Sequence, residues 1–330
     1  MLAAAARTPV THFESALGIQ GQTQGAGTPN QAGIGGFLPL VVSNNSVFFL
    51  DTLANVNFSD FTSSVDNSWA SSIINTTVQG GTISTSSRLG YRWLNSDRSW
   101  MFGVNAGYDS RPMATGQPDT GVTVVNSQTV FFQQVAAGLE AVSNTWNFNA
   151  YALVPVGTTN ATLNSVYPYA DLASTKPYYH SGSLDTYGLD VGYSITPYFK
   201  ASLGYYYQNG DLGSANSSGV RSRLAYNLTN GLTVGANYSY DHAFESRVSG
   251  DIKYRFGTNG YGAPSNRSNV PPVVPVIQAL STTPANRDVR VHDDTPTGYC
   301  SAPSAFATED PRSAAPGQTN NTANAYPCVN

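Results

Sequence analysis

The stretch VSGDIKYRF, residues 248–256, alternates without a break between apolar or glycine positions and polar or charged positions. A β-strand directs successive side chains to opposite faces, so this segment has one apolar face and one charged face. The same alternation recurs in segment after segment, and its apolar positions are often aromatic. Because little sequence remains to build a separate core, the pattern predicts a closed barrel with lipid outside and water inside.

The composition favours the same class of protein. Charged residues make up only 11% of the 330 residues, yet the mean hydropathy is -0.23. Glycine, tyrosine and uncharged polar residues fill the difference, as expected when hydroxyl and amide groups face a lumen and aromatic rings lie at the interfaces. A secreted β-solenoid or β-sandwich would have a similar composition. The net charge of -4 argues against a nucleic-acid partner.

Period-two alternation predicts ten strands of about nine to twelve residues, the length that crosses a bilayer at a tilt. They are Val47–Phe58, Ile83–Trp93, Trp100–Tyr108, Phe131–Ala141, Trp146–Val156, Tyr187–Ile195, Phe199–Gln208, Val220–Leu228, Leu232–Tyr240 and Val248–Phe256. Two weaker candidates, Glu14–Gln22 and Ile34–Val42, raise the expected number to twelve. A ten-stranded barrel with a loose N-terminal arm is the alternative.

We therefore expect an all-β fold, a transmembrane antiparallel up-and-down β-barrel, within a chain of three parts. Residues 1–45 would form a periplasmic arm that carries the two weak strands, residues 46–257 the outer-membrane barrel, and residues 258–330 a tail. The tail is rich in Pro, Ser and Asn and shows no usable period, so it reads as disordered or extended. The first ten residues make a poor signal peptide, and we expect the start to be a processed or truncated boundary.

The lengths of the connections predict the orientation. Tight links alternate with longer links along the chain, and outer-membrane barrels have short periplasmic turns and longer outside loops. The tight links are residues 94–99, 143–145, 196–197 and 229–231. The longer links are residues 59–82, 109–130, 157–186 and 209–219, with 242–247 as a shorter member. The last strand should therefore end in the periplasm.

The alternation also sorts the side chains by face. One arginine on the lipid face at mid-depth costs about 2–4 kcal/mol, so the charged face must be the lumen. The predicted pore-lining residues are Arg88, Arg92, Asn105, Glu140, Asn149, Asp190, Lys200, Arg221, Arg223, Asn237, Asp251, Lys253 and Arg255. The predicted aromatics at the lipid interfaces are Trp93, Trp100, Tyr108, Trp146, Tyr193, Phe199, Tyr207, Tyr240 and Phe256.

Several segments resemble the barrel domain of inverse autotransporters, the intimin and invasin family of adhesins. The matching pieces are RLGYRWLNSDRSWMFGVNAGYD (88–109), AAGLEAVSNTWNFNAYALVPVG (136–157), YGLDVGYSITPYFKASLGYYYQNGD (187–211), LTVGANYSYDH (232–242), IKYRFG (252–257) and GIGGFLPLV (33–41). The resemblance implies twelve strands, a periplasmic N-terminus, and a chain that turns back through the pore to carry an adhesive passenger, usually Ig-like domains. Here only residues 257–330 follow the barrel, without the strand patterning of an Ig-like domain.

We expect a non-enzymatic protein of a Gram-negative-type outer membrane that anchors and exports its own C-terminal segment; a porin-like channel for small solutes is the alternative. Its expected partners are outer-membrane lipid, the barrel-assembly machinery and a surface ligand bound by the outside loops or the tail. No cofactor, metal or catalytic site is predicted; a loop pair such as Asp241–His242 is common by chance. Cys300 and Cys328 either form a disulfide or remain unpaired thiols.

The lumen arginines leave two interpretations open. Arg88, Arg92, Arg221 and Arg223 could form a basic strip that selects anions, since charged rings tune the selectivity of pores. Alternatively, they pair with Glu140, Asp190 and Asp251 and make the wall rigid.

Overall fold

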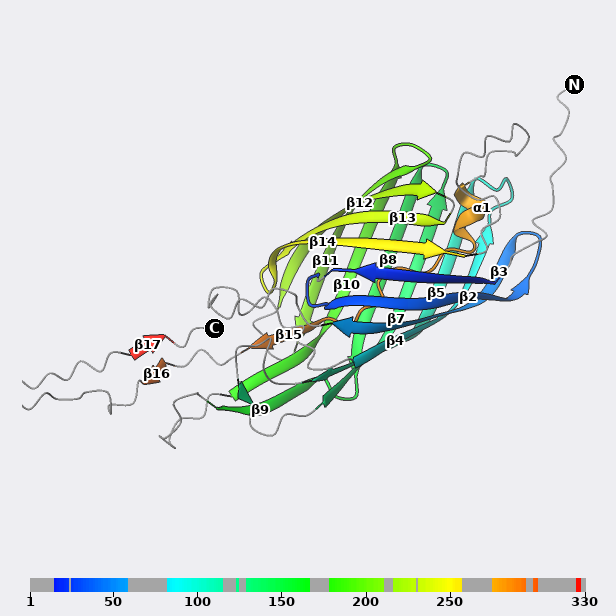
Figure 1. Ribbon diagram of the computed structural model, residues 1–330. Helices are drawn as coiled ribbons and strands as arrows, with labels where there is room; N and C mark the ends of the chain where they lie inside the picture. Colours follow the sequence, from blue (N-terminus) through cyan, green and yellow to red (C-terminus); the bar gives the residue numbers. More distant parts are fainter. Residues whose placement is uncertain are drawn as a thin grey trace, which may run out of the picture.

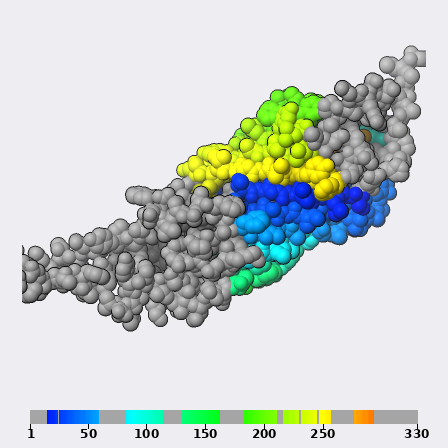
Figure 2. All heavy atoms as spheres, in the orientation of Figure 1, coloured from blue at the N-terminus to red at the C-terminus, as the bar shows by residue number. Residues whose placement is uncertain are grey.

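Twelve long antiparallel strands close into a barrel (Figure 1). The structure, a computed structural model, describes residues 15–23, 25–58, 82–114, 123–124, 129–166, 178–210, 216–229, 231–256, 275–294, 299–301 and 325–327. Closure is made by β1, which pairs with β2 on one side and with β14 on the other. Figure 2 shows this seam as β14 lying directly along β1. The prediction of twelve strands is confirmed, and the ten-stranded alternative is wrong.

The barrel strands follow one another in chain order around the wall. They are β1 (Ala16–Gln22), β2 (Asn30–Val42), β3 (Ser46–Phe58), β4 (Thr82–Leu94), β5 (Trp100–Ala114), β7 (Thr129–Ser143), β8 (Trp146–Val156), β10 (Tyr178–Ser194), β11 (Phe199–Gly210), β12 (Ser217–Thr229), β13 (Leu232–Asp241) and β14 (Glu245–Arg255). Two further strands, β6 (Thr123–Val124) and β9 (Asn160–Val166), extend the sheet beyond β10. No helix among the described residues is long and apolar enough to span a membrane.

The predicted division at residue 46 needs correction. Both β1 and β2 are full members of the wall, so the barrel begins at Ala16 and the two strands do not belong to a separate arm. Their sequence signal is weak because glycines interrupt the alternation. At Gly33 a Cβ atom would lie 1.9 Å from the side-chain oxygen of Asn55, so the close approach of wall and side chain requires glycine there.

The two ends of the barrel differ in their connections. At one end, here called the turn end, consecutive strands are joined by a few residues, namely 43–45, 95–99, 144–145, 195–198 and 230–231. The tight links predicted from the sequence all lie at this end. At the opposite end, called the loop end, lie the longer connections together with the short link 242–244, which is shorter than the predicted 242–247 because β14 begins at Glu245. There β10 and β9 project beyond the other strands (Figure 1). Most residues of the longer links lie outside the described part of the chain.

The outer face of the wall is apolar. On β14, for example, Val248 and Ile252 are 77% and 50% exposed, while Asp251 between them points inward and is buried. Near the turn end, neighbouring aromatic rings follow one another around the outside of β4, β5, β8 and β10, with centroids 4.9–6.2 Å apart. The rings in this aromatic belt are Tyr91, Trp93, Phe102, Trp100, Phe148, Trp146 and Tyr193. Such a belt marks a membrane–water interface.

Part of the C-terminal tail, predicted to be disordered or extended, forms regular structure. Helix α1 (Pro275–Ala279) lies at the turn end, and β15 (Val291–Asp294) pairs with residues 180–183 of β10 at the loop end (Figure 1). Residues 275–294, called the threaded segment, therefore run through the lumen from one end to the other. Farther along, β16 (Tyr299–Ser301) and β17 (Ala325–Pro327) pair with each other.

Candidate functional site

The lumen is the candidate site, and the predicted residues fall where the alternation requires. All the residues predicted to line the pore lie at inward-facing strand positions, and all the predicted interface aromatics lie at outward-facing positions. Six of these aromatics lie near the turn end: Trp93, Trp100, Trp146, Tyr193, Phe199 and Phe256. Tyr108, Tyr207 and Tyr240 lie farther toward the loop end.

The lumen arginines form ion pairs with carboxylates that lie one or two strands away in the wall. Arg88 contacts Asp109 at 2.6 Å, and Arg92 contacts Glu140 at the same distance, with both arginines almost fully buried. The other two pairs, Arg221 with Asp190 and Arg223 with Asp251, are partly exposed. Each arginine of the suggested anion-selecting strip thus has a carboxylate partner. This finding favours a wall stiffened by ion pairs over an anion filter.

Helix α1 fills the turn end with apolar contacts. Its Val276 and Ala279, followed by Leu280, are buried against inward-facing side chains of the wall. The wall side chains in this cluster are Phe37, Val47, Phe49, Leu94 and Met101. A water-filled pore would carry polar side chains at such positions, so their apolar character matches the helix that covers them.

At mid-wall the threaded segment forms an ion pair with the barrel. Arg287 contacts Asp51 of β3, and the two side chains are 5% and 1% exposed. The same guanidinium donates to the hydroxyl of Ser86 at 2.7 Å and to the backbone carbonyl of Ser86 at 2.9 Å. An ion pair so far from water is stable only when both charges are satisfied, which ties the segment to this level of the wall.

The neighbours of Arg287 also contact the wall through their side chains. Asn286 accepts from Arg221 at 2.7 Å and donates to Asn149 at 3.2 Å. Asp288 accepts hydrogen bonds from two wall amides, at 3.0 Å from Gln31 and 3.4 Å from Gln22. Asn286 has a φ of 57°, a left-handed conformation that asparagine adopts more readily than most residues.

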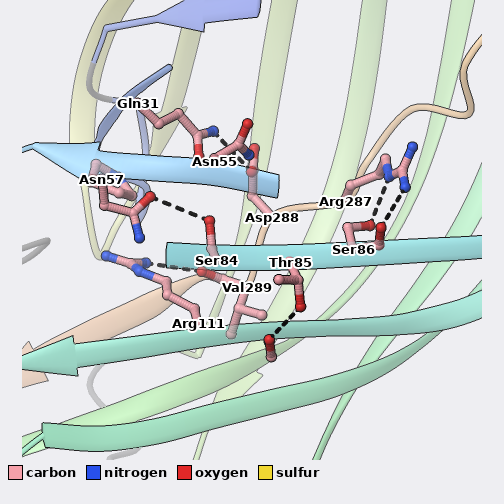
Figure 3. A pocket seen from close by; sticks show the side chains of 12 residues that line it. Gln31, Asn55, Asn57, Ser84, Thr85, Ser86, Arg111, Arg287, Asp288 and Val289 are labelled. Atoms are coloured by element: carbon pink, nitrogen blue, oxygen red, sulfur yellow. Dashed lines mark hydrogen bonds between the residues drawn. The ribbon is translucent and has the colours of Figure 1, made fainter. Parts of the chain in front are cut away.

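The space left between segment and wall at this level is small. A cavity of about 10 Å³ lies among wall residues of β2, β3, β4 and β5 and the segment residues Arg287, Asp288 and Val289 (Figure 3). This volume is about that of one water-sized probe. This cavity is therefore too small to hold a solute.

Near the loop end the segment contacts another part of the wall. The Arg290 guanidinium lies 4.4 Å from the centre of the Tyr206 ring and donates to Gln208 at 3.1 Å. The Tyr206 hydroxyl donates to Asp241 at 2.5 Å. Beside them, the ring of His292 meets that of Phe244 edge-on at 5.6 Å. These contacts hold the segment against β11 and against the turn after β13.

The pair Asp241–His242 does not form an acid–base site in this arrangement. Asp241 accepts hydrogen bonds from Tyr206, Gln208 and the backbone of the following turn, whereas His242 is exposed. Among the described residues, no group of three or more His, Cys, Asp or Glu side chains could hold a metal ion. Cys328 lies outside the described part of the chain, so its disulfide with Cys300 stays a prediction.

Several residues of the site were missed by the sequence reasoning. Asp109 and Arg111 were assigned to a loop because the strand was ended at Tyr108, whereas β5 continues to Ala114. Asp51 has an inward-facing position, but Val47 and Phe49 on the same face hide the polar pattern. No local signal marks Arg287, whose partner is far away in the sequence.

No protein-family model matches this chain, and no curated protein matches it. A solved structure from a study of the in-meso crystallization of membrane proteins aligns with a TM-score of 0.53 at 12% identity, covering 85% of this chain and 99% of its own. The KdgM porin aligns with a TM-score of 0.36 at 8% identity, covering 72% and 98%. Outer membrane phospholipase A from Escherichia coli gives 0.37 at 13% identity, covering 73% and 94%.

The first of these likenesses shows a shared fold with a membrane protein, and the other two are too distant to add to it. The closed twelve-stranded barrel, its apolar outer face and its aromatic belt are the features of outer-membrane barrels. The protein is therefore an outer-membrane β-barrel of a Gram-negative-type bacterium.

Proposed function

We propose that the protein is a non-enzymatic barrel of the inverse-autotransporter type, which anchors in the outer membrane and displays the C-terminal chain that passes through its own lumen. The observation that carries this proposal is the threaded segment, held by α1 at the turn end, by Arg287 at mid-wall and by β15 at the loop end. Roughly ten residues of extended chain cover about 30 Å, the thickness of the hydrocarbon core.

The direction of the chain supports display at the surface. The tight connections of the turn end are typical of the periplasmic side of outer-membrane barrels, so the loop end would face outward. The segment begins with α1 at the turn end and reaches the loop end at β15. On this assignment the residues after 294 emerge outside, where they and the longer connections would meet a surface ligand. Barrel insertion would rely on the barrel-assembly machinery.

A porin-like channel for small solutes is the second candidate. The observation in its favour is that water reaches the lumen beside the segment along β11 to β14. There the Arg221 and Arg223 side chains are 26% and 30% exposed, and Lys200 and Lys253 are exposed. On this reading, the segment would be a plug that moves aside to let solutes pass.

Single-channel recording distinguishes the two candidates. The full chain and a variant lacking residues 257–330 are compared in planar bilayers, after heat-dependent gel mobility has verified the folded barrel of each. A much smaller conductance of the full chain supports the display barrel. Equal, large conductances with and without the tail contradict it and favour the porin.

Surface proteolysis tests the direction of the chain independently. Trypsin is added to intact cells, and cleavage after Arg312 is followed with an epitope tag placed behind Asn330. Release of the tag from intact cells is expected. Release only after lysis would contradict surface display, whatever the conductance.

A further inference from the structure

The barrel wall binds the threaded segment in two chemically different ways. In the first, inward-facing wall side chains donate hydrogen bonds to backbone carbonyls of the segment. We call the four donors, Arg92, Arg88, Gln134 and Arg111, the carbonyl ladder. From the turn end to the loop end, the bonds are Arg92 to Leu280 (3.2 Å) and Thr282 (2.5 Å), Arg88 to Asn286 (3.3 Å), Gln134 to Asp288 (3.3 Å) and Arg111 to Val289 (2.9 Å).

The charges at the centre of the ladder are balanced by the wall itself. Glu140 accepts from Nε and Nη2 of Arg92, which leaves Nη1 for the segment. Asp109 accepts from both Arg88 and Gln134. These donors are at most 1% exposed. Because Glu140 and Asp109 balance the arginine charges, the N–H groups that face the segment bind uncharged carbonyls and need no opposite charge on it.

A backbone carbonyl is present at every residue, so contacts of this kind do not depend on the sequence of the bound chain. Between Leu280 and Asn286, the side chains of Thr282 and Ala285 are exposed inside the lumen, whereas Thr283 contacts Asp51 of the wall. An extended polypeptide of a different sequence could make the same hydrogen bonds at these positions.

The second mode of binding depends on side chains. We call Asn286, Arg287, Asp288 and Arg290 the register lock, because each makes contacts that a shifted chain would lose. Arg287 pairs with Asp51, and Asp288 accepts from Gln31 and Gln22. The remaining contacts are those of Asn286 with Arg221 and Asn149, and of Arg290 with Tyr206 and Gln208.

We infer that the lumen is a binding site for extended polypeptide backbone of any sequence, and that the register lock stops the chain at one position. The carbonyl ladder holds whichever stretch occupies the lumen during export. The lock is satisfied only when residues 286–290 arrive, which fixes the final register. This inference rests on the proposed display function and names the class of ligand that the lumen accepts.

The test reads the register of the segment in the full chain. In a background with Cys300→Ser and Cys328→Ser, Ser183→Cys is combined with Val291→Cys, its partner in the β10–β15 pairing, or with Val289→Cys or Asp293→Cys. Disulfide formation then reports a segment in register or shifted by two residues. The lock variant carries Asn286→Ala, Arg287→Gln, Asp288→Asn and Arg290→Gln. Its matched control carries Thr282→Gln and Ala285→Gln, at exposed positions of the segment.

The unsubstituted chain and the control should give only the 183–291 product. The lock variant should keep the low conductance of the full chain, because the ladder still holds the segment, but its products should spread to positions 289 and 293. A lock variant that conducts like the chain without residues 257–330 would overturn the inference, since the ladder would then be insufficient. If the lock variant gave the 183–291 product and no product at positions 289 or 293, the role of the lock would be overturned.

Misfolding of the variant and failure of the proposed display function give different results. If the fourfold variant does not fold, Asn286→Ala alone is measured in the same way, because it removes no buried charge. If the unsubstituted full chain already conducts as well as the deletion variant, the proposed display function fails, and the cross-linking pattern is not needed to show it.

Discussion

Arg287 of the threaded segment and Asp51 of β3 form a buried ion pair between parts of the chain more than two hundred residues apart. Its side chains are 5% and 1% exposed, so neither charge can be compensated by water. The carboxylate of Asp51 in the barrel wall is thus neutralised by a cation from the segment that occupies the lumen. A wall built for an open, water-filled pore would gain nothing from this arrangement.

Removing the cation should therefore be costly. Arg287→Ala leaves Asp51 buried without its partner, and breaking a buried pair in this way costs about 3–5 kcal/mol. We expect a lower urea midpoint for refolded protein in vesicles, while the conductance stays low because the carbonyl ladder still holds the segment. Lys200→Ala, at an exposed position of the lumen, is the control and should change little. The double variant Asp51→Ala with Arg287→Ala should recover part of the loss; equal effects of Arg287→Ala and the control would contradict the prediction.

The apolar contacts of α1 predict a second effect. Val276→Asp places a carboxylate among buried apolar side chains such as Phe49 and Met101, so the helix should leave the turn end. Conductance should rise toward that of the chain without residues 257–330. Gln278→Asp, on the partly exposed side of the same helix, introduces the same charge and should not raise it. Similar conductance of the two variants would show that α1 does not close the turn end.

Adjacent positions on β11 should differ strongly in how much the same charge destabilises the barrel. Leu203 is 66% exposed on the lipid face, and Ser202 points into the lumen. Leu203→Arg should lower the free energy of unfolding in vesicles by about 2–4 kcal/mol, and Ser202→Arg should lower it by much less. Unfolding in urea, followed by tryptophan fluorescence, measures both. A larger loss for Ser202→Arg would reverse the assignment of the two faces.

The aromatic belt predicts the depth of its tryptophans. Trp100 stacks on Phe102 with centroids 6.2 Å apart and should lie at the membrane–water interface. In a variant that keeps Trp100 as its single tryptophan, lipids brominated near the headgroup should quench its fluorescence more than lipids brominated near the chain end. A single tryptophan introduced as Leu203→Trp, farther from the turn end, should show the opposite order. Stronger quenching of Trp100 by the deeply brominated lipid would place the belt inside the hydrocarbon core.

The wall could be predicted because its signals are local. A strand alternates with period two, and a tight turn needs only a few suitable residues, so the strands and the turn end follow from short stretches of sequence. The pairing of lumen charges could be predicted in part from the alternation. Arg221 and Asp190, for example, were both assigned to the inner face and form an ion pair. Glycine-rich β1 and β2 gave weaker signals because the side chains that would mark their outer face are partly absent.

The sequence by itself determined a membrane barrel, its two faces and the end at which the chain leaves the wall, because each of these depends on residues next to one another. Only the tertiary structure decided what occupies the lumen. Residues 275–294 have no period of their own, and their partners, from Phe37 to Phe244, are contributed by strands spread over the whole wall. Those contacts exist only once the barrel has closed around the segment, so no stretch of sequence taken alone could reveal them.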